Sequence, residues 1–289
     1  MNQASTMPAA FIGHGSPMNT LETNRFTAMW RQLGETLPRP RAILSISAHW
    51  YINGSAVTAM PQPRVIHDFY GFPKALFDFD YPAPGAPDVA AEIVEVVRPG
   101  FVALDRDSWG LDHGTWSVLA HVFPKADIPV VQLSVHAGEE LRYHFELGKR
   151  LAPLRERGIF ILGSGNVVHN LRGIDWNLPD EAFDWANDFD AQVKQAMTTD
   201  PERLLSITNH PNYSMAVPTP EHFLPLVYLA GLSAAAGQPS QVLVEGGAMG
   251  SLTMTSFVLG GGAIPKPQTD EAAASMPDPA DILPEHTNI

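Results

Sequence analysis

Short apolar runs that alternate with longer segments of helical periodicity constrain the fold of this chain more than any other feature. Apolar runs bounded by glycine or polar residues are typical of strands that are covered on both faces of a sheet. They occupy residues 9–13, 42–48, 130–135, 159–163, 241–245 and 252–259. Segments with helical spacing lie between them, at residues 22–36, 86–97, 139–155, 180–197 and 220–236. The alternation predicts an α/β fold with a mostly parallel or mixed central sheet and helices on both faces.

A single domain accounts for most of the chain. Its 289 residues, of which 45% are hydrophobic, can bury a sizeable core, and no internal repeat divides them. We therefore expect one domain over residues 8–260. From residue 261 the composition changes to five prolines, five acidic residues and one lysine. That composition predicts a flexible, acidic and proline-rich tail over residues 261–289.

The charge and the residue types that are missing exclude several classes of protein. The formal net charge is −13, which disfavours binding to nucleic acid or to an anionic membrane. The sequence shows neither a long apolar run nor a basic and apolar N-terminal leader, so a cytoplasmic protein is expected. The chain has no cysteine, which excludes disulfides, thiolate metal sites and a cysteine nucleophile.

Three of the eleven histidines come at or just after the ends of predicted strands. His14 follows the first strand, His49 follows the second, and His169 lies a few residues beyond the strand at 159–163. In an open α/β sheet, sites form outside the carboxyl ends of the strands. Neutral imidazole is a good ligand for zinc, iron, copper and nickel. The positions predict that these side chains converge at one edge of the sheet, where they could hold a metal ion.

Other histidines are secondary candidates, and each has an ordinary structural alternative. His113 follows Asp112 in a turn, where a hydrogen bond from its ring to Asp112 would be enough to explain it. His222 is placed at the start of the helix predicted over 220–236, where Thr219 could cap and His222 could be a surface residue of the first turn. His136 also ends a strand and is kept in reserve. A lone histidine after a strand is usually a loop residue, so the coincidence of three carries the metal hypothesis.

Residues 61–87 form a long segment that is rich in proline and aromatic residues. The composition is too aromatic for a disordered linker and favours an ordered loop. Such loops often form the wall or lid of a site, although packing on the surface is an equally good alternative. The sequence also lacks the H-E-x-x-H motif of helix-borne zinc proteases and the G-x-S-x-G motif of α/β-hydrolases.

Five short motifs occur in an order that resembles a known family. They are GHGSP at 13–17, SAHW at 47–50, LDHGTW at 111–116, GSGN with HNL over 163–171, and PEHFLPL at 220–226. Together they resemble the DOPA 4,5-dioxygenase-type enzymes of the class III, or LigB-like, extradiol ring-cleavage dioxygenases. The resemblance covers about residues 8–260. Each motif alone is weak, and their shared order is what makes the resemblance specific.

The resemblance implies roles for five histidines. His14, His49 and His222 would be the metal ligands. His169 would be the catalytic acid and base or an additional ligand, and His113 a second group near the substrate oxygens. The wider class uses two histidines and one carboxylate, so Glu245 is a reserve ligand. Oxygen-dependent ring cleavage in this family needs Fe(II), although Zn(II) can occupy such sites.

The implied function is a non-haem Fe(II) extradiol dioxygenase. It would insert O2 into a catechol-type ring, DOPA-like or related, and give a ring-opened semialdehyde; its partners are the small aromatic diol and O2. The sequence at 169–171 departs from the plant enzymes, which makes DOPA itself a doubtful substrate. Trp50 and Tyr51 could pack on the substrate or in the core. The alternatives are a zinc-dependent hydrolase or amidase and a non-catalytic binding module.

Overall fold

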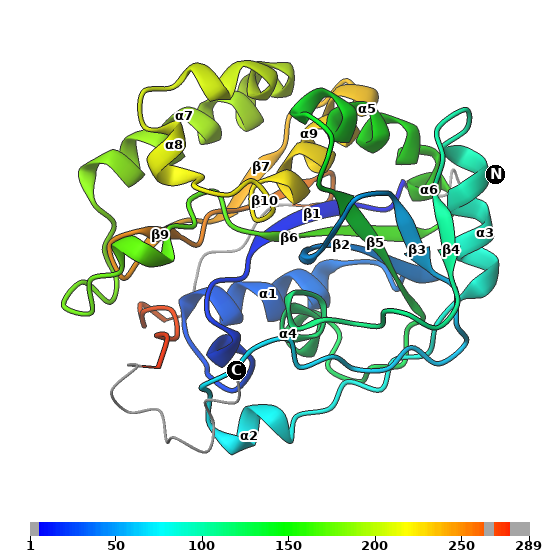
Figure 1. Ribbon diagram of the computed structural model, residues 1–289, viewed down its shortest axis with the longest axis horizontal. Helices are drawn as coiled ribbons and strands as arrows, with labels where there is room; N and C mark the ends of the chain where they lie inside the picture. The colour runs from blue at the N-terminus through cyan, green and yellow to red at the C-terminus, as the bar shows by residue number, and fades with distance from the viewer. Residues whose placement is uncertain (1–5, 263–268, 278–289) are drawn as a thin grey trace.

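The computed structural model describes residues 6–262 and 269–277. Over these residues the chain forms an α/β domain around an eight-stranded mixed sheet, with strand order β4-β3-β5-β2-β6-β1-β10-β7 (Figure 1). The four central strands are parallel to one another. The strands are β1 (Ala9–Gly13), β2 (Ala42–Ile52), β3 (Ala56–Thr58), β4 (Ala103–Asp105), β5 (Val130–His136), β6 (Ile159–Gly165), β7 (Gln241–Val244) and β10 (Ser256–Leu259), and a separate pair is formed by β8 (Gly247–Ala248) and β9 (Leu252–Thr253).

Helices cover both faces of the sheet, as the sequence predicts. One face packs against α1 (Arg25–Thr36) and α4 (His113–Val122). The other face packs against α3 (Pro87–Val96), α5 (Leu141–Leu151), α6 (Pro153–Glu156), α7 (Asp184–Thr199) and α9 (Leu224–Ala236). The short helices are α2 (Lys74–Phe77), α8 (Tyr213–Ala216) and the 3-10 turns η1 (Pro17–Thr20), η2 (Leu171–Gly173) and η3 (Pro201–Asn209). No helix in the described ranges is long and apolar enough to cross a membrane.

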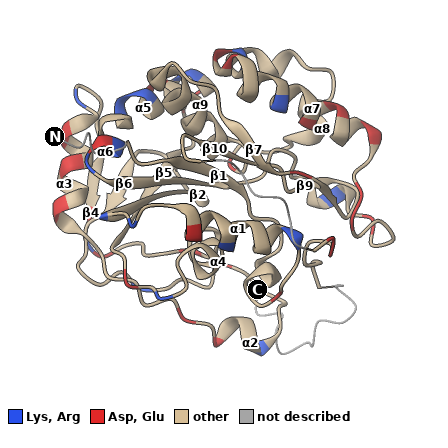
Figure 2. Ribbon diagram, turned by 180° about the vertical axis from the view of Figure 1, so that it is seen from behind, with Lys and Arg blue, Asp and Glu red and all other residues tan. Residues whose placement is uncertain are grey.

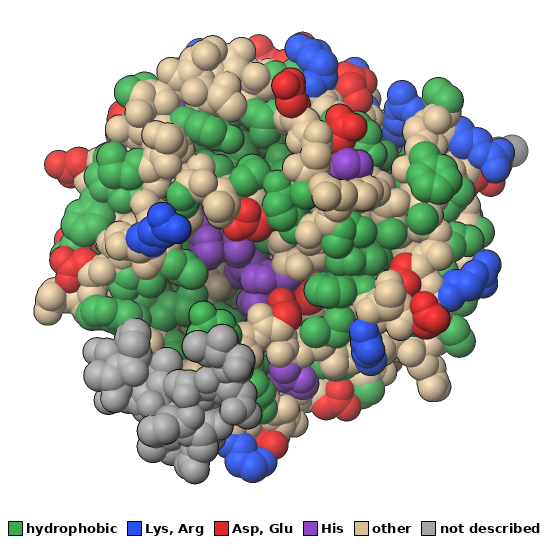
Figure 3. Space-filling model, viewed as in Figure 1, with side chains coloured by type: hydrophobic (Ala, Val, Ile, Leu, Met, Phe, Trp, Pro, Cys, Tyr) green, Lys and Arg blue, Asp and Glu red, His purple; other side chains and the backbone are tan. Residues whose placement is uncertain are grey.

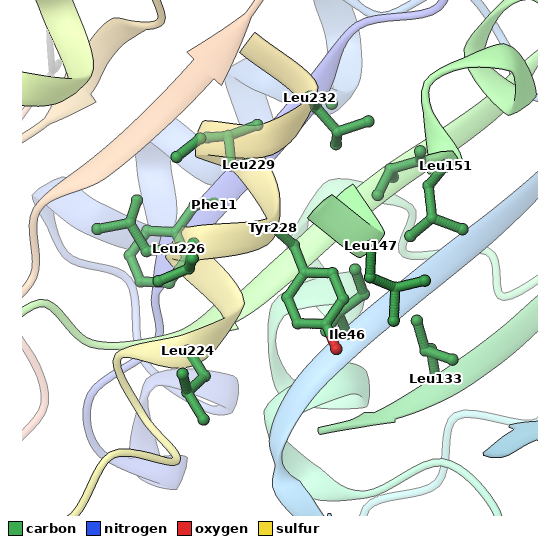
Figure 4. Close-up of a cluster of buried hydrophobic side chains, with 14 of the residues drawn as sticks. Phe11, Ile46, Leu133, Leu147, Leu151, Leu224, Leu226, Tyr228, Leu229 and Leu232 are labelled. Carbon is green, nitrogen blue, oxygen red and sulfur yellow. The ribbon is translucent and has the colours of Figure 1, made fainter. Parts of the chain in front are cut away.

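The alternation of side chains along each strand builds two cores. In β1, Phe11 enters the core under α5 and α9, whereas Ile12 enters the core under α1 and α4. Figure 4 shows the first of these cores, where Tyr228 and four leucines of α9 meet Phe11, Ile46 and Leu133 of the sheet. The strands β1, β2, β5 and β6 have no charged residue, and Figure 2 shows the charges mainly on the helices and loops.

Glycines allow α5 and α9 to approach closely. A Cβ atom at Gly231 would lie 2.1 Å from the backbone oxygen of Phe145, and one at Gly148 would lie 2.3 Å from that of Tyr228. Both contacts are with backbone, which cannot rotate away as a side chain can. The crossing of the two helices therefore requires glycine at both positions.

We expect Gly231→Ala to destabilise the fold by about 1–3 kcal/mol, because the added methyl group forces the two helix backbones apart. The free energy of unfolding in urea measures the effect. Gly262→Ala is the matched control, since no described atom lies within 4 Å of a Cβ built there. Equal stabilities of the two variants would contradict the packing described here.

Several elements differ from their predicted bounds. The strand predicted over 42–48 continues as β2 to Ile52, with a register shift against β5 between Ile46 and Tyr51. The helix predicted over 139–155 is two helices, because Pro153 starts α6. The helix predicted from residue 220 begins only at Leu224, so Thr219 does not cap it. The strand predicted over 252–259 is divided into β9 and β10.

Candidate metal centre

Five histidines gather in a hollow of the surface at the carboxyl ends of the parallel strands. Figure 3 shows histidine side chains together in this hollow, bordered by hydrophobic residues. His14 follows β1, and His49 lies in the part of β2 where the register shifts. His113 starts α4, His169 follows β6, and His222 is in the turn before α9. All five predicted site residues are therefore brought together.

Three of these imidazoles form a nearly equilateral triangle. The ring centroids of His14 and His49 are 5.2 Å apart, those of His14 and His222 are 5.3 Å apart, and those of His49 and His222 are 5.0 Å apart. The Nε2 atoms of His14 and His49 face each other at 3.3 Å. The centroids of rings from three separate elements thus all lie within 5.3 Å of one another.

The Nδ1 atom of each ring in this triangle has a partner in the protein. His14 Nδ1 lies 2.9 Å from Ser164 Oγ, whose hydroxyl donates to the backbone oxygen of Gly114. Because Ser164 donates elsewhere, His14 Nδ1–H must be the donor to it. His49 Nδ1 lies 3.2 Å from Asp68 Oδ2, and His222 Nδ1 lies 3.2 Å from Glu221 Oε1.

These contacts fix the tautomers of the three rings. Hydrogen atoms on Nδ1 leave each Nε2 with a lone pair, the form that binds a metal. Two such lone pairs at 3.3 Å repel each other unless a cation lies between them. The donor set is neutral imidazole nitrogen, which suits Fe(II) and Zn(II). The residues present therefore fit a divalent metal ion.

His113 and His169 lie against this triangle. The His113 ring is 3.8 Å from the His49 ring, and its Nδ1 lies 3.0 Å from Asp68 Oδ1. The His169 ring is stacked on the His222 ring at 3.5 Å. Measured between ligand atoms, His113 groups with His14 and His49 within 4.8 Å, whereas His169 groups with His222 and Glu221. By the ligand atoms His113 completes a set of three with His14 and His49, whereas by the ring centroids His222 is the nearer of the two to His14.

Burial controls the charge of the cluster. Burial, and then the neighbouring histidines, hold the pKa values of His14, His49 and His222 well below their usual range. Burial, followed by the charge of His113, lowers the pKa of His169 to about 4. Packed together and out of water, these imidazoles are neutral at pH 7, as metal ligands and proton acceptors must be.

Asp68 is the anion of the site. Burial alone would raise its pKa, but the hydrogen bond and charge of His113, with the charge of His49, outweigh burial and lower the pKa to about 2. It also accepts a hydrogen bond of 2.9 Å from the backbone N–H of His113. One carboxylate therefore orients two of the five histidines.

Asp112 links the start of α4 to β2 and β5 behind the histidines. It caps α4 by accepting from the backbone N–H of Thr115, and it accepts from Ser47 Oγ at 2.7 Å and from Gln132. Burial and the charge of Asp68 raise its pKa to about 6. The expected contact of Asp112 with the His113 ring is replaced by that of Asp68.

A cavity of about 530 Å³ opens in front of the histidines. The loop 61–87 lines it, which confirms the prediction that this loop forms a wall of a site. The apolar residues of the wall are Pro17, Phe69, Tyr70, Phe72, Leu171, Ile174, Trp176, Met276 and Pro277. An aromatic ring could thus be enclosed directly in front of the imidazole cluster.

Other candidates lie outside the cavity. Glu245 binds Lys194 at 2.5 Å on the surface, so it is not placed to act as the reserve ligand. His136 packs near Tyr143 instead of entering the cluster. Trp50 is buried and stacks on Trp109, and Tyr51 donates to the backbone oxygen of Ala137, so neither side chain lines the cavity.

Asp68→Asn is expected to weaken metal binding about 10- to 100-fold, because the neutral amide no longer fixes His49 and His113. Asp80→Asn, in the same loop but exposed, is the control and should bind metal like the wild type. Isothermal titration of the apoprotein with Zn(II) measures both. Equal affinities in the two variants would show that Asp68 does not orient the ligands.

Comparisons with known proteins place most of the chain in one family. Residues 9–251 match the family described as the catalytic LigB subunit of aromatic ring-opening dioxygenase. The 4,5-DOPA dioxygenase extradiol of Escherichia coli (strain K12) is 48% identical over 262 residues, which cover 89% of this chain and 96% of that protein. The 4,5-DOPA dioxygenase extradiol of Beta vulgaris is 38% identical over 261 residues, covering 85% and 96%.

A solved structure extends the likeness to the fold. The crystal structure of an uncharacterized protein from Escherichia coli K12 has a TM-score of 0.77 and 44% sequence identity, and the match covers 88% of this chain and 100% of that one. Since the family match spans most of the domain and includes all five clustered histidines, the chain belongs to the LigB family and is an extradiol ring-cleavage dioxygenase.

Proposed function

We propose that the protein is an Fe(II)-dependent dioxygenase that opens a catechol-type ring and retains both atoms of O2 in a ring-opened semialdehyde. His14, His49 and His222 would hold the metal. The observation that supports this most strongly is the triangle of three imidazoles, each with its Nδ1 beside a polar partner in the protein. It lies at the end of a cavity large enough for an aromatic diol.

When bound, Fe(II) would supply a Lewis acid for the two diol oxygens and a redox centre for O2. The protein supplies the rest. Phe69 and Phe72, from the loop 61–87, exclude water from the ring. Asp68 lies 3.0 Å from His113 Nδ1 and 3.2 Å from His49 Nδ1, so its negative charge favours these ring positions. Rings that are held in this way keep a constant distance and orientation to the bound substrate.

His169 is proposed as the group that takes the phenolic proton. Its ring lines the cavity and stacks on His222, so it is next to the metal ligands without needing to be one. Its backbone N–H donates to Ala216, which fixes its place after β6. His113, which lies against His49 and also lines the cavity, is the second group that can deliver a proton to a reacting oxygen.

The choice between His222 and His113 as third ligand is open to a direct test. The ring centroids favour His222, which lies 5.3 Å from His14 whereas His113 lies 5.9 Å from it, but the ligand atoms group His113 with His14 and His49. The same site with zinc-bound hydroxide could in principle serve a hydrolase, but membership of the LigB family does not favour that alternative.

Anaerobic reconstitution with Fe(II), followed by exposure to O2 and catechol, tests the proposed function. We expect uptake of one O2 per catechol and a yellow product that is heavier than the catechol by two oxygen atoms. Zn(II)-loaded protein should bind the diol without consuming O2. Turnover of the catechol without O2, or equal activity with zinc, would overturn the proposal.

A further inference from the structure

The C-terminal segment 269–277 closes one side of the cavity. Met276 and Pro277 line the cavity together with residues of the loop 61–87 and the region around η2. The segment was expected to be part of a flexible tail; in the part described here, Ala274 is buried and the chain lies against the domain. Residues 263–268 and 278–289 of the expected tail are outside the described residues.

Hydrogen bonds attach this segment to the metal centre. The backbone N–H of Ala274 donates to Asn19 Oδ1 at 2.9 Å, and Asn19 Nδ2 donates to the backbone oxygen of His14 at 3.0 Å. Ser16 Oγ donates to the backbone oxygen of Ser275 at 2.9 Å. The segment also lies beyond residue 251, where the family match ends. The segment is therefore a wall of the cavity that lies outside the residues of the family match.

The lining of the cavity has no described cation. Apart from the histidines, its charged residue is Asp68, an anion, and the whole chain has a net charge of −13. Of the residues that the structure does not describe, Lys266 is the sole lysine or arginine. Arg172 lies next to two lining residues but does not line the cavity. A carboxylate brought into such a cavity would lose water without gaining an ion pair.

The rim offers apolar contact instead. Tyr70, Leu171 and Trp176 line the cavity while remaining 69%, 49% and 41% exposed. A volume of about 530 Å³ is within the range of roughly 300–1,000 Å³ for pockets that bind drug-sized ligands, and exceeds what a bare diol fills. The remaining space in front of the metal centre suits a sizeable apolar group.

We propose that the segment 269–277, through Met276, completes an apolar pocket that selects catechols whose ring substituent is extended and uncharged. This inference rests on the proposed ring-opening function and specifies its substrate class. It makes Met276 a specificity-determining residue. The substituent would point away from the histidines and pack among Met276, Trp176 and Tyr70.

A pair of substrates that differ in charge and by one methyl group tests the proposal: hydrocaffeate and its methyl ester. For the wild type we expect kcat/KM for the ester to exceed that for the acid by about tenfold or more. Met276→Lys should shift this ratio toward the acid by about tenfold, because its ammonium group can pair with the carboxylate. Met276→Leu, which keeps the apolar wall, should preserve the wild-type ratio.

Two further variants separate the pocket from other sources of charge. Phe101→Lys adds the same charge at a side chain that is 78% exposed and does not line this cavity, so it should leave the ratio unchanged. An equal shift in Phe101→Lys and Met276→Lys would overturn the role of Met276. If the wild type preferred the acid, and Arg172→Gln lost that preference, the proposed substrate class would be overturned. Arg172 would then be the residue that binds the carboxylate.

Binding to the Zn(II)-loaded protein, measured by calorimetry, gives the same comparison without turnover. We expect tighter binding of the ester in the wild type and a shift of about tenfold toward the acid in Met276→Lys. If the Fe(II)-loaded enzyme consumed no O2 with either compound, the proposed function would be wrong. The binding measurement would still test the pocket separately. Equal binding of acid and ester would contradict the pocket proposal alone.

Discussion

Replacing His14 with alanine is expected to remove bound Fe(II) and to lower kcat/KM by more than about a hundredfold, beyond the loss typical of residues that only orient a ligand. The reason is geometric. The Nε2 atom of His14 faces that of His49 at 3.3 Å, and its ring is one corner of the imidazole triangle. Without it, two nitrogen donors remain. Metal content by mass spectrometry and O2 uptake measure the two effects.

His136→Ala is the matched control, because His136 also ends a parallel strand but lies outside the cluster. It should keep both metal and activity. The same measurement on His222→Ala and His113→Ala identifies the third ligand: we expect metal loss in the first and retention in the second. A His14→Ala protein that bound Fe(II) as tightly as the wild type would contradict the proposed centre.

Replacing His169 with alanine is expected to lower kcat about 10²- to 10⁴-fold, the usual range for a lost proton acceptor, while most of the metal is retained. The ring lies on His222 at 3.5 Å and lines the cavity, so its removal leaves the triangle itself intact. A change in the pH dependence of kcat should accompany the loss, since the remaining activity no longer depends on this imidazole.

Metal content decides between the two roles considered for His169. Near-complete loss of Fe(II) from His169→Ala would make it a ligand and contradict its role as proton acceptor. Asn170→Ala is a neighbouring control: the Asn170 side chain holds the loop through Met215 and Arg172 without lining the cavity. It should reduce kcat far less than the loss of His169.

The sheet and the meeting of the histidines were predictable because both follow from local pattern. Apolar runs such as 9–13 and 159–163 form parallel neighbours in the centre of the sheet. Since the carboxyl ends of parallel strands lie at one edge, His14 and His169 had to come close together. His49 was expected to follow the end of its strand; it joins the cluster although β2 continues to Ile52, in the part of β2 where the register against β5 shifts.

Two parts of the site could not be predicted in this way. Asp68 lies in the loop 61–87, which has no periodicity from which to infer where a side chain points, and its importance depends on tertiary contacts with His49 and His113. Only its place next to the aromatic run in that loop hinted at a site. The segment 269–277 has the composition of a solvated tail, and its attachment rests on a few backbone contacts such as that of Ala274 with Asn19.

The boundary before α9 shows why helix starts are hard to infer. Thr219 and Pro220 are favourable residues for a helix start, yet α9 begins at Leu224 with Pro225 in its first turn. The intervening turn places His222 beside His169, and Glu221, next to it in the chain, accepts from its Nδ1. Local preference therefore favours a helix from Pro220, but the chain forms a turn there, and this turn places His222 in the site.

X-ray absorption at the iron edge of the Fe(II)-loaded protein tests the central claim most directly, since it reports which atoms surround the metal. The account predicts one Fe(II) per chain with scattering from about three imidazole rings, reduced by one ring in His222→Ala and unchanged in His136→Ala. An inner shell of water and carboxylate oxygens without imidazole, or a spectrum that does not change when His14 is replaced, would contradict it.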